Sequence, residues 1–420
     1  MKYLTVSLYH PRVMKGGAQY VAKDLHDIAR ADADVEPVLL AGIDGNMFPQ
    51  YAKVGSAITA LPDSPDEFLL PGTRFDDFHH VVYDARRNKA IKRFLEDHKP
   101  DVIHVHHSLW IGLEFLQLAR QVLPDVKIIY TLHEYLAICY LRGQLFRDTE
   151  GGICHDTSPD QCTRCFPDRT ADDFILRRRG FKRAFELVDH FISPSEYLRQ
   201  RFITWGLGAD RISVIANGHT PSRPADWAPT HSPGVNVFGF FGQYVDVKGI
   251  DVLLRAAVIA AEHMDEDQEI EIKIFGGNKQ HASGSYLEKI EEILEDAPDN
   301  LKITEMGSYS RDNVFDLMTT VDWVVTPSVW PETFGLVVSE AWDARRPVIA
   351  SRAGGLSDRI VDGKNGFSFL PGSTTHLAQI LQECVGNSES WRAMAGSMAD
   401  EITLDAAWDA HKQVIADLRG

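Results

Sequence analysis

The chain has 420 residues, of which 44% are apolar and 25% charged; this composition is typical of a folded protein and excludes disordered, collagen-like and coiled-coil classes. The length predicts two domains, and no apolar run reaches the roughly 20 residues that span a bilayer. The net charge is −17, and residues 218–420 hold 16 Lys and Arg against 31 Asp and Glu, which argues against binding to nucleic acid.

Apolar, β-branched runs alternate with segments of helical period along the chain. The first half predicts a helix at 18–29 and strands at 3–8, 38–41, 102–105, 127–131, 191–193 and 212–215. The second half predicts strands at 237–241, 269–275, 301–304, 323–326 and 347–350. Continuous apolar strands separated by helices indicate parallel sheets covered on both faces. We therefore predict an α/β protein with two tandem Rossmann-like domains and a ligand cleft between them.

Interruptions of this alternation predict the domain boundaries. The stretch between 215 and 235 is rich in Pro, Ser and Thr and is interpreted as a linker. We predict an N-terminal domain over 1–217, a C-terminal domain over 218–395 and a terminal helix over 396–420. Residues 43–80 show no clear period and are predicted to be long surface connections. Residues 134–170 are rich in Gly, Asp, Pro and Cys, and are predicted to be an insertion on the first domain.

The segment 326–351 carries the most specific chemical signal. A strand ends at 326, Pro331 blocks a helix, and Thr333 is the predicted N-cap of the helix that follows. Free amides at a helix start bind phosphate, and here they would be those of Phe334, Gly335 and Leu336.

Two glutamates bracket this predicted helix start. Glu332 lies just outside it, and Glu340 lies about two turns beyond the cap, roughly 10 Å along the axis on nearly the same face. The spacing suits the two ends of a nucleotide-sugar, with diphosphate on the amides, the sugar near Glu332 and ribose near Glu340. Two ordinary glutamates on a surface helix would show the same spacing.

This segment resembles the Glu-x7-Glu motif of the retaining glycosyltransferases of family 4. Further motifs similar to those of the family cover nearly the whole chain: a Gly-Gly loop after the first strand, TLHEY, SPSEYLRQRF, VIANG, FFGQYVDVKGIDVLLRA and GGLSDRIVDGKNGF. The resemblance implies the glycosyltransferase-B fold, in which two Rossmann-like domains face a cleft. It also implies that the C-terminal helix, around Trp408, crosses back onto the first domain.

The resemblance also implies roles for single residues. Glu332 would orient sugar hydroxyls and stabilise charge as a catalytic residue, and Glu340 would bind ribose. His133, at the end of a strand, matches a family histidine near the donor sugar. Gly16 and Gly17 would let the backbone approach the donor diphosphate or the acceptor, a role that needs no side chain.

Two positions that follow the first strand of the second domain concern the diphosphate. Lys248 matches the family's phosphate-binding lysine. Gln243 stands where the family usually has an arginine, so compensation of the leaving diphosphate is predicted to be weaker unless another cation, such as Arg352, enters.

The implied activity is a retaining hexosyl transfer from a UDP or GDP sugar to a hydroxyl of a glycan, a glycolipid or a small molecule. The acceptor would attack on the face from which diphosphate leaves, and no catalytic metal is expected. Two alternatives are a sugar-nucleotide epimerase or hydrolase on the same fold, and a non-catalytic nucleotide-sugar-binding protein, which the Gln243 departure keeps open.

Four of the five cysteines lie within 27 residues: Cys139, Cys154, Cys162 and Cys165. The last two form a Cys-x2-Cys pair typical of zinc sites, and an irregular insertion with little core would gain stability from a metal. A structural zinc, unliganded thiols and disulfides remain as interpretations.

Two further clusters have open interpretations. Alternation places His104 and His106 on one face of the strand and its extension, and His107 at the mouth of the strand. A metal site or a contact with acceptor or ligand is one interpretation of these histidines, and a structural role is favoured. A basic segment over 177–183 is either a solvated face or a contact with a membrane surface or a lipid-linked acceptor. The start of the chain lacks signal-peptide order, so we expect a cytoplasmic protein, with this segment as an optional contact at the inner membrane face.

Overall fold

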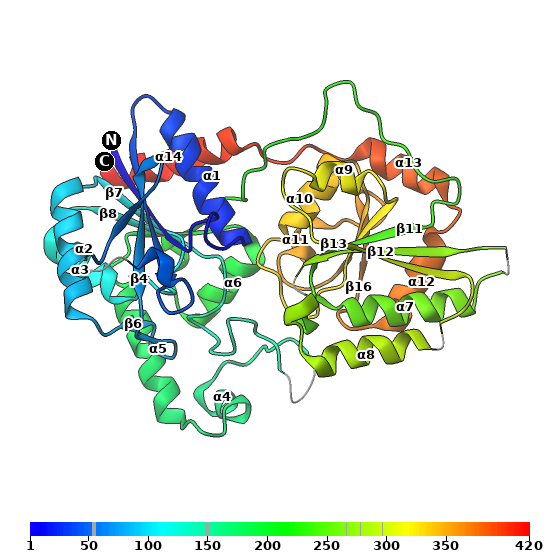
Figure 1. Cartoon of the computed structure of the whole chain (residues 1–420), viewed down its shortest axis with the longest axis horizontal. Helices are drawn as coiled ribbons and strands as arrows, with labels where there is room; N and C mark the ends of the chain where they lie inside the picture. The colour runs from blue at the N-terminus through cyan, green and yellow to red at the C-terminus, as the bar shows by residue number, and fades with distance from the viewer. Residues whose placement is uncertain (53–55, 148–151, 266, 278, 296) are drawn as a thin grey trace. The chain divides into compact units, whose positions relative to one another are not determined.

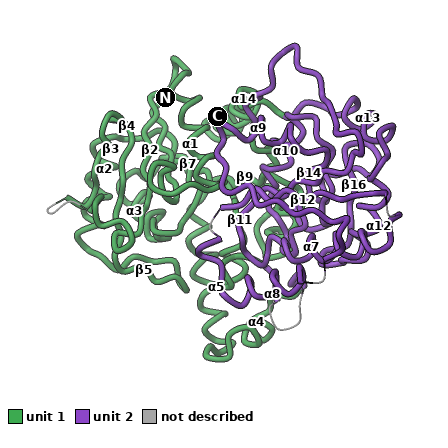
Figure 2. The backbone as a smooth tube through the Cα atoms, turned by 45° about the vertical axis from the view of Figure 1, so that its right-hand side comes forward, with its two compact units in different colours: residues 1–144, 156–218, 402–420 green, residues 145–155, 219–401 purple. Residues whose placement is uncertain are grey.

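The computed structural model describes residues 1–420 except 53–55, 148–151, 266, 278 and 296. The chain forms two compact units, shown in Figure 2. Unit 1 contains residues 1–144, 156–218 and 402–420, and unit 2 contains residues 145–155 and 219–401. Each unit is built around its own predominantly parallel sheet (Figure 1). The predicted insertion at 134–170 is therefore divided, because residues 145–155 group with unit 2.

Unit 1 has an eight-stranded sheet in the order β10-β9-β8-β7-β1-β2-β4-β3, in which only the β3–β4 pair is antiparallel. Its strands are β1 (Lys2–Leu8), β2 (Glu36–Asp44), β3 (Thr59–Leu61), β4 (Ser64–Gly72), β7 (Val102–Val105), β8 (Lys127–Thr131), β9 (His190–Ser193) and β10 (Ile212–Val214). A separate hairpin joins β5 (Phe75–Asp76) and β6 (Val81–Val82). The helices are α1 (Gly17–Ala31), α2 (Ala85–His98), α3 (Glu114–Val122), α4 (Pro159–Cys165), α5 (Ala171–Phe185), α6 (Glu196–Trp205) and α14 (Leu404–Arg419), with short 3-10 turns at Pro49–Tyr51 and Ala209–Arg211.

The prediction of surface connections over 43–80 is wrong for β4, which pairs in parallel with β2 through Leu39–Asp44. Leu69 and Leu70 of β4 are fully buried. The apolar pattern was hidden because β4 also buries a carboxylate, Glu67, which reaches ion-pair partners instead of water.

The C-terminal helix α14 packs on unit 1, as the sequence predicted. Trp408 donates its indole N–H to Asp32 at 3.1 Å, and Lys412 contacts the same carboxylate at 3.1 Å. The Trp408 ring also meets the Tyr3 ring edge-on, with 5.3 Å between centroids. Asp32, at the end of α1, therefore anchors the returning helix.

Unit 2 has a six-stranded parallel sheet in the order β13-β12-β11-β14-β15-β16. Its strands are β11 (Val237–Gln243), β12 (Ile270–Gly277), β13 (Leu301–Gly307), β14 (Trp323–Thr326), β15 (Val348–Ser351) and β16 (Gly366–Phe369). The helices are α7 (Ile250–Glu262), α8 (Gly284–Glu295), α9 (Val314–Met318), α10 (Leu336–Asp343), α11 (Leu356–Arg359), α12 (Thr374–Cys384) and α13 (Ser388–Ser397), with 3-10 turns η3 (Asp246–Lys248) and η4 (Lys279–His281).

The strand order of unit 2 locates its ligand edge. The chain builds outward from β11 to β12 and β13, and then returns to β14 on the other side of β11. At such a reversal the loops that leave neighbouring strands diverge, and open α/β sheets bind their ligands at the carboxyl ends of these strands.

One apolar layer, with α7, α12 and α13, covers one face of the sheet, and a second layer, with α9, α10 and α11, covers the other. No helix in the described part of the chain is long and apolar enough to cross a membrane.

Candidate active site

The loops after β11 and β14 meet at the reversal point of the unit 2 sheet. Lys248 ends the turn η3 after β11, and Gly249 follows it with φ of 73°. A Cβ at Gly249 would lie 2.1 Å from the carbonyl oxygen of Pro327, which follows β14. Only glycine allows this approach. The Lys-Gly pair of the sequence motif therefore brings the lysine next to the segment after β14.

This approach places the Lys248 ammonium on the Glu332 carboxylate. Lys248 Nζ lies 2.6 Å from Glu332 Oε1, and the same oxygen accepts hydrogen bonds from Ser328 Oγ at 2.6 Å and Trp330 Nε1 at 3.0 Å. The Lys248 ammonium also lies 5.4 Å from the centre of the Trp330 ring. Glu332 is 9% exposed. Three donors on Oε1 orient the carboxylate so that Oε2 is the oxygen left for a ligand hydroxyl.

The backbone of Glu332 is held by the glycines of the GGLSD segment. Gly355 donates its N–H to the Glu332 carbonyl at 2.6 Å, and Gly354 forms a bridge with Glu332. Gly354 has φ of 67°, and a Cβ there would lie 2.1 Å from the Glu332 carbonyl oxygen. The motif therefore contributes close backbone packing beneath the carboxylate, which a side chain would prevent.

The predicted start of the next helix is wrong by two residues. Helix α10 begins at Leu336, and its N-cap is Gly335 with φ of 87°, not Thr333. A left-handed cap suits glycine, whereas a β-branched residue strongly disfavours it. Of the three predicted amides, that of Leu336 lies in the first helical turn, and those of Phe334 and Gly335 precede the helix. The Phe334 ring is buried beneath the Arg359 guanidinium, 4.1 Å from its centre.

Glu340 lies on α10 among groups that the sequence did not single out. Burial raises the pKa of Glu340 to about 7, and the positive charges of Arg311 and His219 offset part of this effect. The Glu340 charge in turn adds to the effect of burial in raising the pKa of Tyr309. These partners come from the loop after β13 and the start of unit 2, so only the folded chain brings them to the helix.

Gln243 and Arg352 differ in their surroundings. Gln243 is the last residue of β11 and is exposed. Arg352 donates to Ser368 Oγ at 2.8 Å and pairs with Asp362 at 3.3 Å. Arg352, the cation predicted to compensate for the absent arginine, therefore already binds Ser368 of β16 and Asp362.

In unit 1 the predicted residues lie at the carboxyl ends of two strands. Gly16 caps α1 in an extended conformation, and Gly17 is the first helical residue. His133 follows β8, and its Nε2 lies 2.9 Å from Nδ1 of His106. Burial, with a contribution from neighbouring histidines, lowers the pKa of His133 to about 3. His133 is therefore a neutral imidazole at pH 7.

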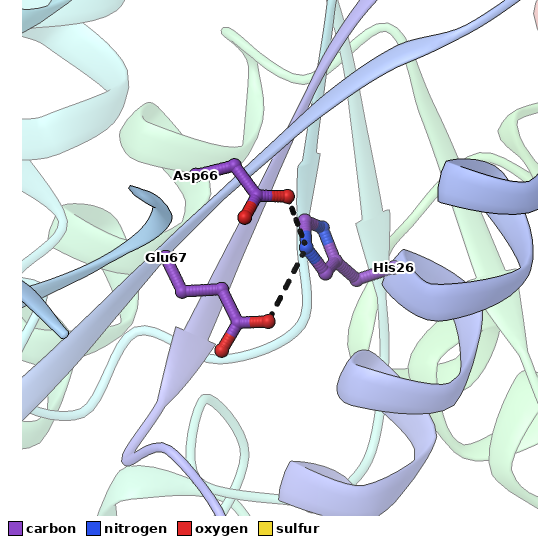
Figure 3. Close-up of side chains that lie close together, drawn as sticks. All are labelled: His26, Asp66 and Glu67. Carbon is purple, nitrogen blue, oxygen red and sulfur yellow. Dashed lines mark ion pairs between the residues drawn. The ribbon is translucent and has the colours of Figure 1, made fainter. Parts of the chain in front are cut away.

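Among the described residues, one group brings three metal-ligating side chains together: His26, Asp66 and Glu67 (Figure 3). Arg30 already lies in this group, with Nη2 at 3.0 Å from His26 Nε2 and at 2.7 Å from both carboxylates. A metal ion would have to displace this guanidinium. The group is therefore an ion-pair network that ties α1 to β4.

The four clustered cysteines are half-buried: Cys139, Cys154, Cys162 and Cys165. Cys154 groups with unit 2 and the other three with unit 1. Burial lowers the pKa of the Arg177 guanidinium to about 10, and the nearby Cys139 and Cys162 side chains offset part of this effect. The zinc site stays a prediction.

The basic segment on α5 does not form one exposed face. Arg177 is buried, and its guanidinium donates to the carbonyl oxygens of Leu136 and Ala137. Arg178 donates to the carbonyl of Trp205, and Lys182 lies over the Trp205 ring. The exposed cations of this segment are Arg179 and Arg183. The sequence could not reveal this, because an arginine that binds backbone carbonyls looks like any other. Contact with a membrane stays a prediction.

Comparison with known proteins covers both units. Residues 16–223 match the family described as Glycosyltransferase Family 4, and residues 224–397 match the family described as Glycosyl transferases group 1. The D-inositol 3-phosphate glycosyltransferase of Rhodococcus jostii is 32% identical over 391 residues, which cover 90% of this chain and 78% of that protein. The protein of the same name from Nocardia farcinica is 29% identical over 305 residues, which cover 70% of this chain and 60% of the relative's length.

Solved structures show the same fold at low sequence identity. HepE of Anabaena, crystallised in complex with UDP, has a TM-score of 0.66 at 17% identity, with 99% of this chain and 100% of that chain covered. The sucrose-phosphate synthase of Thermosynechococcus elongatus has a TM-score of 0.66 at 17% identity, with 100% and 99% covered.

Proposed function

This chain belongs to glycosyltransferase family 4 and has the glycosyltransferase-B fold, and from that membership we propose that it transfers a hexosyl group from a nucleoside diphosphate sugar to a hydroxyl acceptor with retention of configuration. The membership supports a sugar transferase. The donor class, the stereochemistry and the acceptor are the proposed part.

The Lys248–Glu332 pair is the observation that carries this proposal. An ammonium and a carboxylate lie 2.6 Å apart at the reversal point of a parallel sheet, and α10 begins four residues after Glu332. The ammonium and the helix amides suit a diphosphate, and the carboxylate oxygen Oε2 suits a sugar hydroxyl. In this proposal the diphosphate meets a cation, and the sugar hydroxyl meets a hydrogen-bond acceptor.

The proposed reaction proceeds on one face of the sugar. The bond between the anomeric carbon and the phosphate oxygen breaks, and the acceptor oxygen forms its bond to the same carbon from the same side. The acceptor proton passes to the leaving phosphate oxygen. Lys248 stabilises the charge that develops on the diphosphate, and Glu332 holds the sugar and stabilises positive charge on its ring. The resemblance to the retaining enzymes of family 4 supports this route over a covalent glycosyl-enzyme.

The comparisons suggest which compounds to test first. HepE is crystallised with UDP, and several relatives are named for D-inositol 3-phosphate. We propose a UDP-sugar as the donor and a hydroxyl on a small phosphorylated polyol or a glycan as the acceptor.

The test combines binding, turnover and stereochemistry. UDP, GDP and ADP, each with and without its sugar, are screened by thermal shift, and the best donor is incubated with and without an acceptor panel that includes D-inositol 3-phosphate. Acceptor-dependent product with the donor's anomeric configuration, read by NMR, is expected. An inverted anomer would contradict the proposed mechanism.

Two other outcomes correspond to the alternatives. Consumption of the donor at the same rate without acceptor would indicate an epimerase or a hydrolase. Tight binding without turnover on any acceptor would indicate a non-catalytic binding protein. The motivation for this alternative is Gln243, which stands where the family usually has an arginine.

For metals, we propose one structural zinc on the four clustered cysteines and none in the reaction. Elemental analysis of reduced protein should give about one zinc per chain. EDTA should leave transfer intact, because Lys248 and helix amides bind the diphosphate. A zinc content near zero would reject the zinc site alone.

A further inference from the structure

A row of imidazole rings in unit 1 leads to His133. His104 lies on β7, His106 follows it, and His411 comes from α14. The ring centroids are 5.4 Å apart between His411 and His104, 4.1 Å between His104 and His106, and 5.2 Å between His106 and His133. The first three rings are buried, and His133 is half-buried at the end of the row. His106 has no role in the function proposed above.

All four imidazoles are uncharged at neutral pH. Burial lowers the pKa of His411 to about 4, and burial together with neighbouring histidines lowers the pKa values of His104 and His106 well below the usual value. A neutral imidazole carries one N–H and one acceptor nitrogen. The hydrogen bonds along the row therefore specify where each proton sits.

Both ring nitrogens of His104 are already engaged. Nδ1 lies 2.5 Å from the Tyr3 hydroxyl, and Nε2 lies 2.6 Å from Thr131 Oγ1. His104 therefore has no nitrogen left for His106, although the two rings are in contact. The Nε2 atom of His106 is buried and has no hydrogen-bond partner among the residues that the structure describes.

This unpartnered nitrogen decides the direction of the bond between His106 and His133. If His133 donated its Nε2 proton, the single proton of His106 would sit on its own Nε2, as a buried N–H without an acceptor. In folded proteins, buried N–H groups without an acceptor are rarer than buried acceptor atoms without a donor. If His106 donates from Nδ1 instead, its Nε2 is only an unused acceptor, and His133 Nε2 accepts.

We propose that His106 is a positioning residue that holds His133 in the tautomer with the proton on Nδ1, so that His133 meets its ligand as a neutral hydrogen-bond donor. The ligand atom that fits is an acceptor oxygen, of a hydroxyl or a phosphate, and not a proton to be abstracted. The tautomer rests on the geometry of unit 1, and its effect on turnover rests on the proposed function.

The tautomer can be measured directly in the whole protein. Long-range proton–nitrogen NMR on protein labelled at histidine distinguishes the protonated from the unprotonated ring nitrogen, and loss of signals in His133→Gln assigns the ring. We expect a protonated Nδ1 and an unprotonated Nε2 on His133 from pH 6 to 8. A protonated Nε2, or an imidazolium, would overturn the proposal.

Substitutions of His106 separate positioning from simple stability. His106→Asn can still donate from about the position of Nδ1, and His106→Leu cannot donate. His106→Leu should shift His133 toward the other tautomer and lower kcat about tenfold, with UDP affinity within about twofold, and His106→Asn should recover most of the rate. As a control, His190→Asn, which removes an imidazole bonded to Ser213 in the same unit, should change neither kcat nor the tautomer.

The outcomes also separate this inference from the proposed function. If His133 has its proton on Nδ1 but the protein has no transferase activity, the inference about His106 stands and the proposed function is rejected. If the protein transfers sugar but His133 has its proton on Nε2, the proposed function stands and the inference is rejected. If His106→Leu fails to fold, the wild-type spectrum and His106→Asn still decide, because equal tautomers and a recovered rate are expected for Asn.

Discussion

Glu332 in unit 2 and His133 in unit 1 are both predicted to meet the sugar, and they are held in opposite ways. Glu332 has an ammonium counter-charge at 2.6 Å and two further donors on the same oxygen. His133 lies beside neutral histidines and has its pKa lowered to about 3 by burial. Burial without a counter-charge favours the neutral form of an imidazole. Glu332 is therefore held by a cation and two further donors, whereas His133 is held among neutral rings.

Glu340 lies between these two cases. It lies on α10, which begins four residues after Glu332, and its pKa is raised to about 7 because burial outweighs the charges of Arg311 and His219. The Glu340 carboxyl group therefore titrates near neutral pH, and a bound ligand that donates hydrogen bonds to it would favour its ionised form.

The largest expected effect is that of removing the Glu332 charge. Glu332→Gln should lower kcat by about 100-fold or more while UDP still binds, because the carboxylate acts at the sugar and not at the nucleotide. Steady-state kinetics and calorimetry with UDP measure the two parts. Glu291→Gln, an exposed substitution on α8, is the control and should be neutral. A loss of UDP binding equal to the loss of rate would contradict this division of roles.

The second test asks whether Lys248 and Glu332 act as a pair. Lys248→Met should weaken UDP binding about 10- to 100-fold, because an ammonium bond to phosphate is lost and a largely buried carboxylate loses its counter-charge. The double variant with Glu332→Gln should lose less than the sum of the single losses, with a coupling of about 0.5 to 3 kcal/mol. Strict additivity would mean that the pair is not coupled in the ligand complex. Lys364→Met, at an exposed site in the same unit, is the matched control.

The third test uses the raised pKa of Glu340. Ribose hydroxyls donate to the ionised carboxylate, so affinity for a UDP-sugar should rise as pH increases through about 7, and Glu340→Gln should abolish this rise. Glu340→Ala should weaken binding by about 1 to 3 kcal/mol. Calorimetry from pH 6 to 8 measures both, with Glu383→Gln on α12 as the control.

The raised pKa of Glu340 also affects the stability of the protein without ligand. Stability should fall with rising pH, whereas affinity for the UDP-sugar should rise. Because the folded pKa of Glu340 is raised, its contribution to the unfolding free energy is fully present below the unfolded value near 4.5 and is lost as pH rises through about 7. Relative to wild type, the Gln variant without ligand should gain stability over this range. A pH-independent difference in denaturant midpoint would show that Glu340 does not titrate there.

The smallest expected effect concerns the exposed end of β11. Gln243→Arg should raise turnover or tighten diphosphate binding by a few fold, about 0.5 to 1 kcal/mol, because it adds a cation near the developing charge. Kinetics and UDP calorimetry measure it, and retention should persist. If the arginine abolishes binding, Gln243 is a specific contact and not a weakened arginine.

The sequence was most informative where one element carries its own signal. The strands 102–105, 127–131 and 323–326 were predicted with the bounds that the structure shows, because each is a continuous apolar run. β4 was missed because Glu67 breaks its pattern. The start of α10 was misplaced because Thr333 looks like a cap, whereas the left-handed conformation of Gly335 ends the preceding loop.

The sequence by itself determined the fold class, the return of the C-terminal helix and the identities of Lys248, Glu332 and His133 as candidates. The tertiary structure alone decided how they are held. Lys248 meets Glu332 across 84 residues, and Asp32 meets Trp408 across 376. The physical reason is that a parallel sheet gathers the carboxyl ends of strands that lie far apart in the chain. Which donor meets which acceptor at that edge depends on strand order, register and glycine turns, none of which a local pattern encodes.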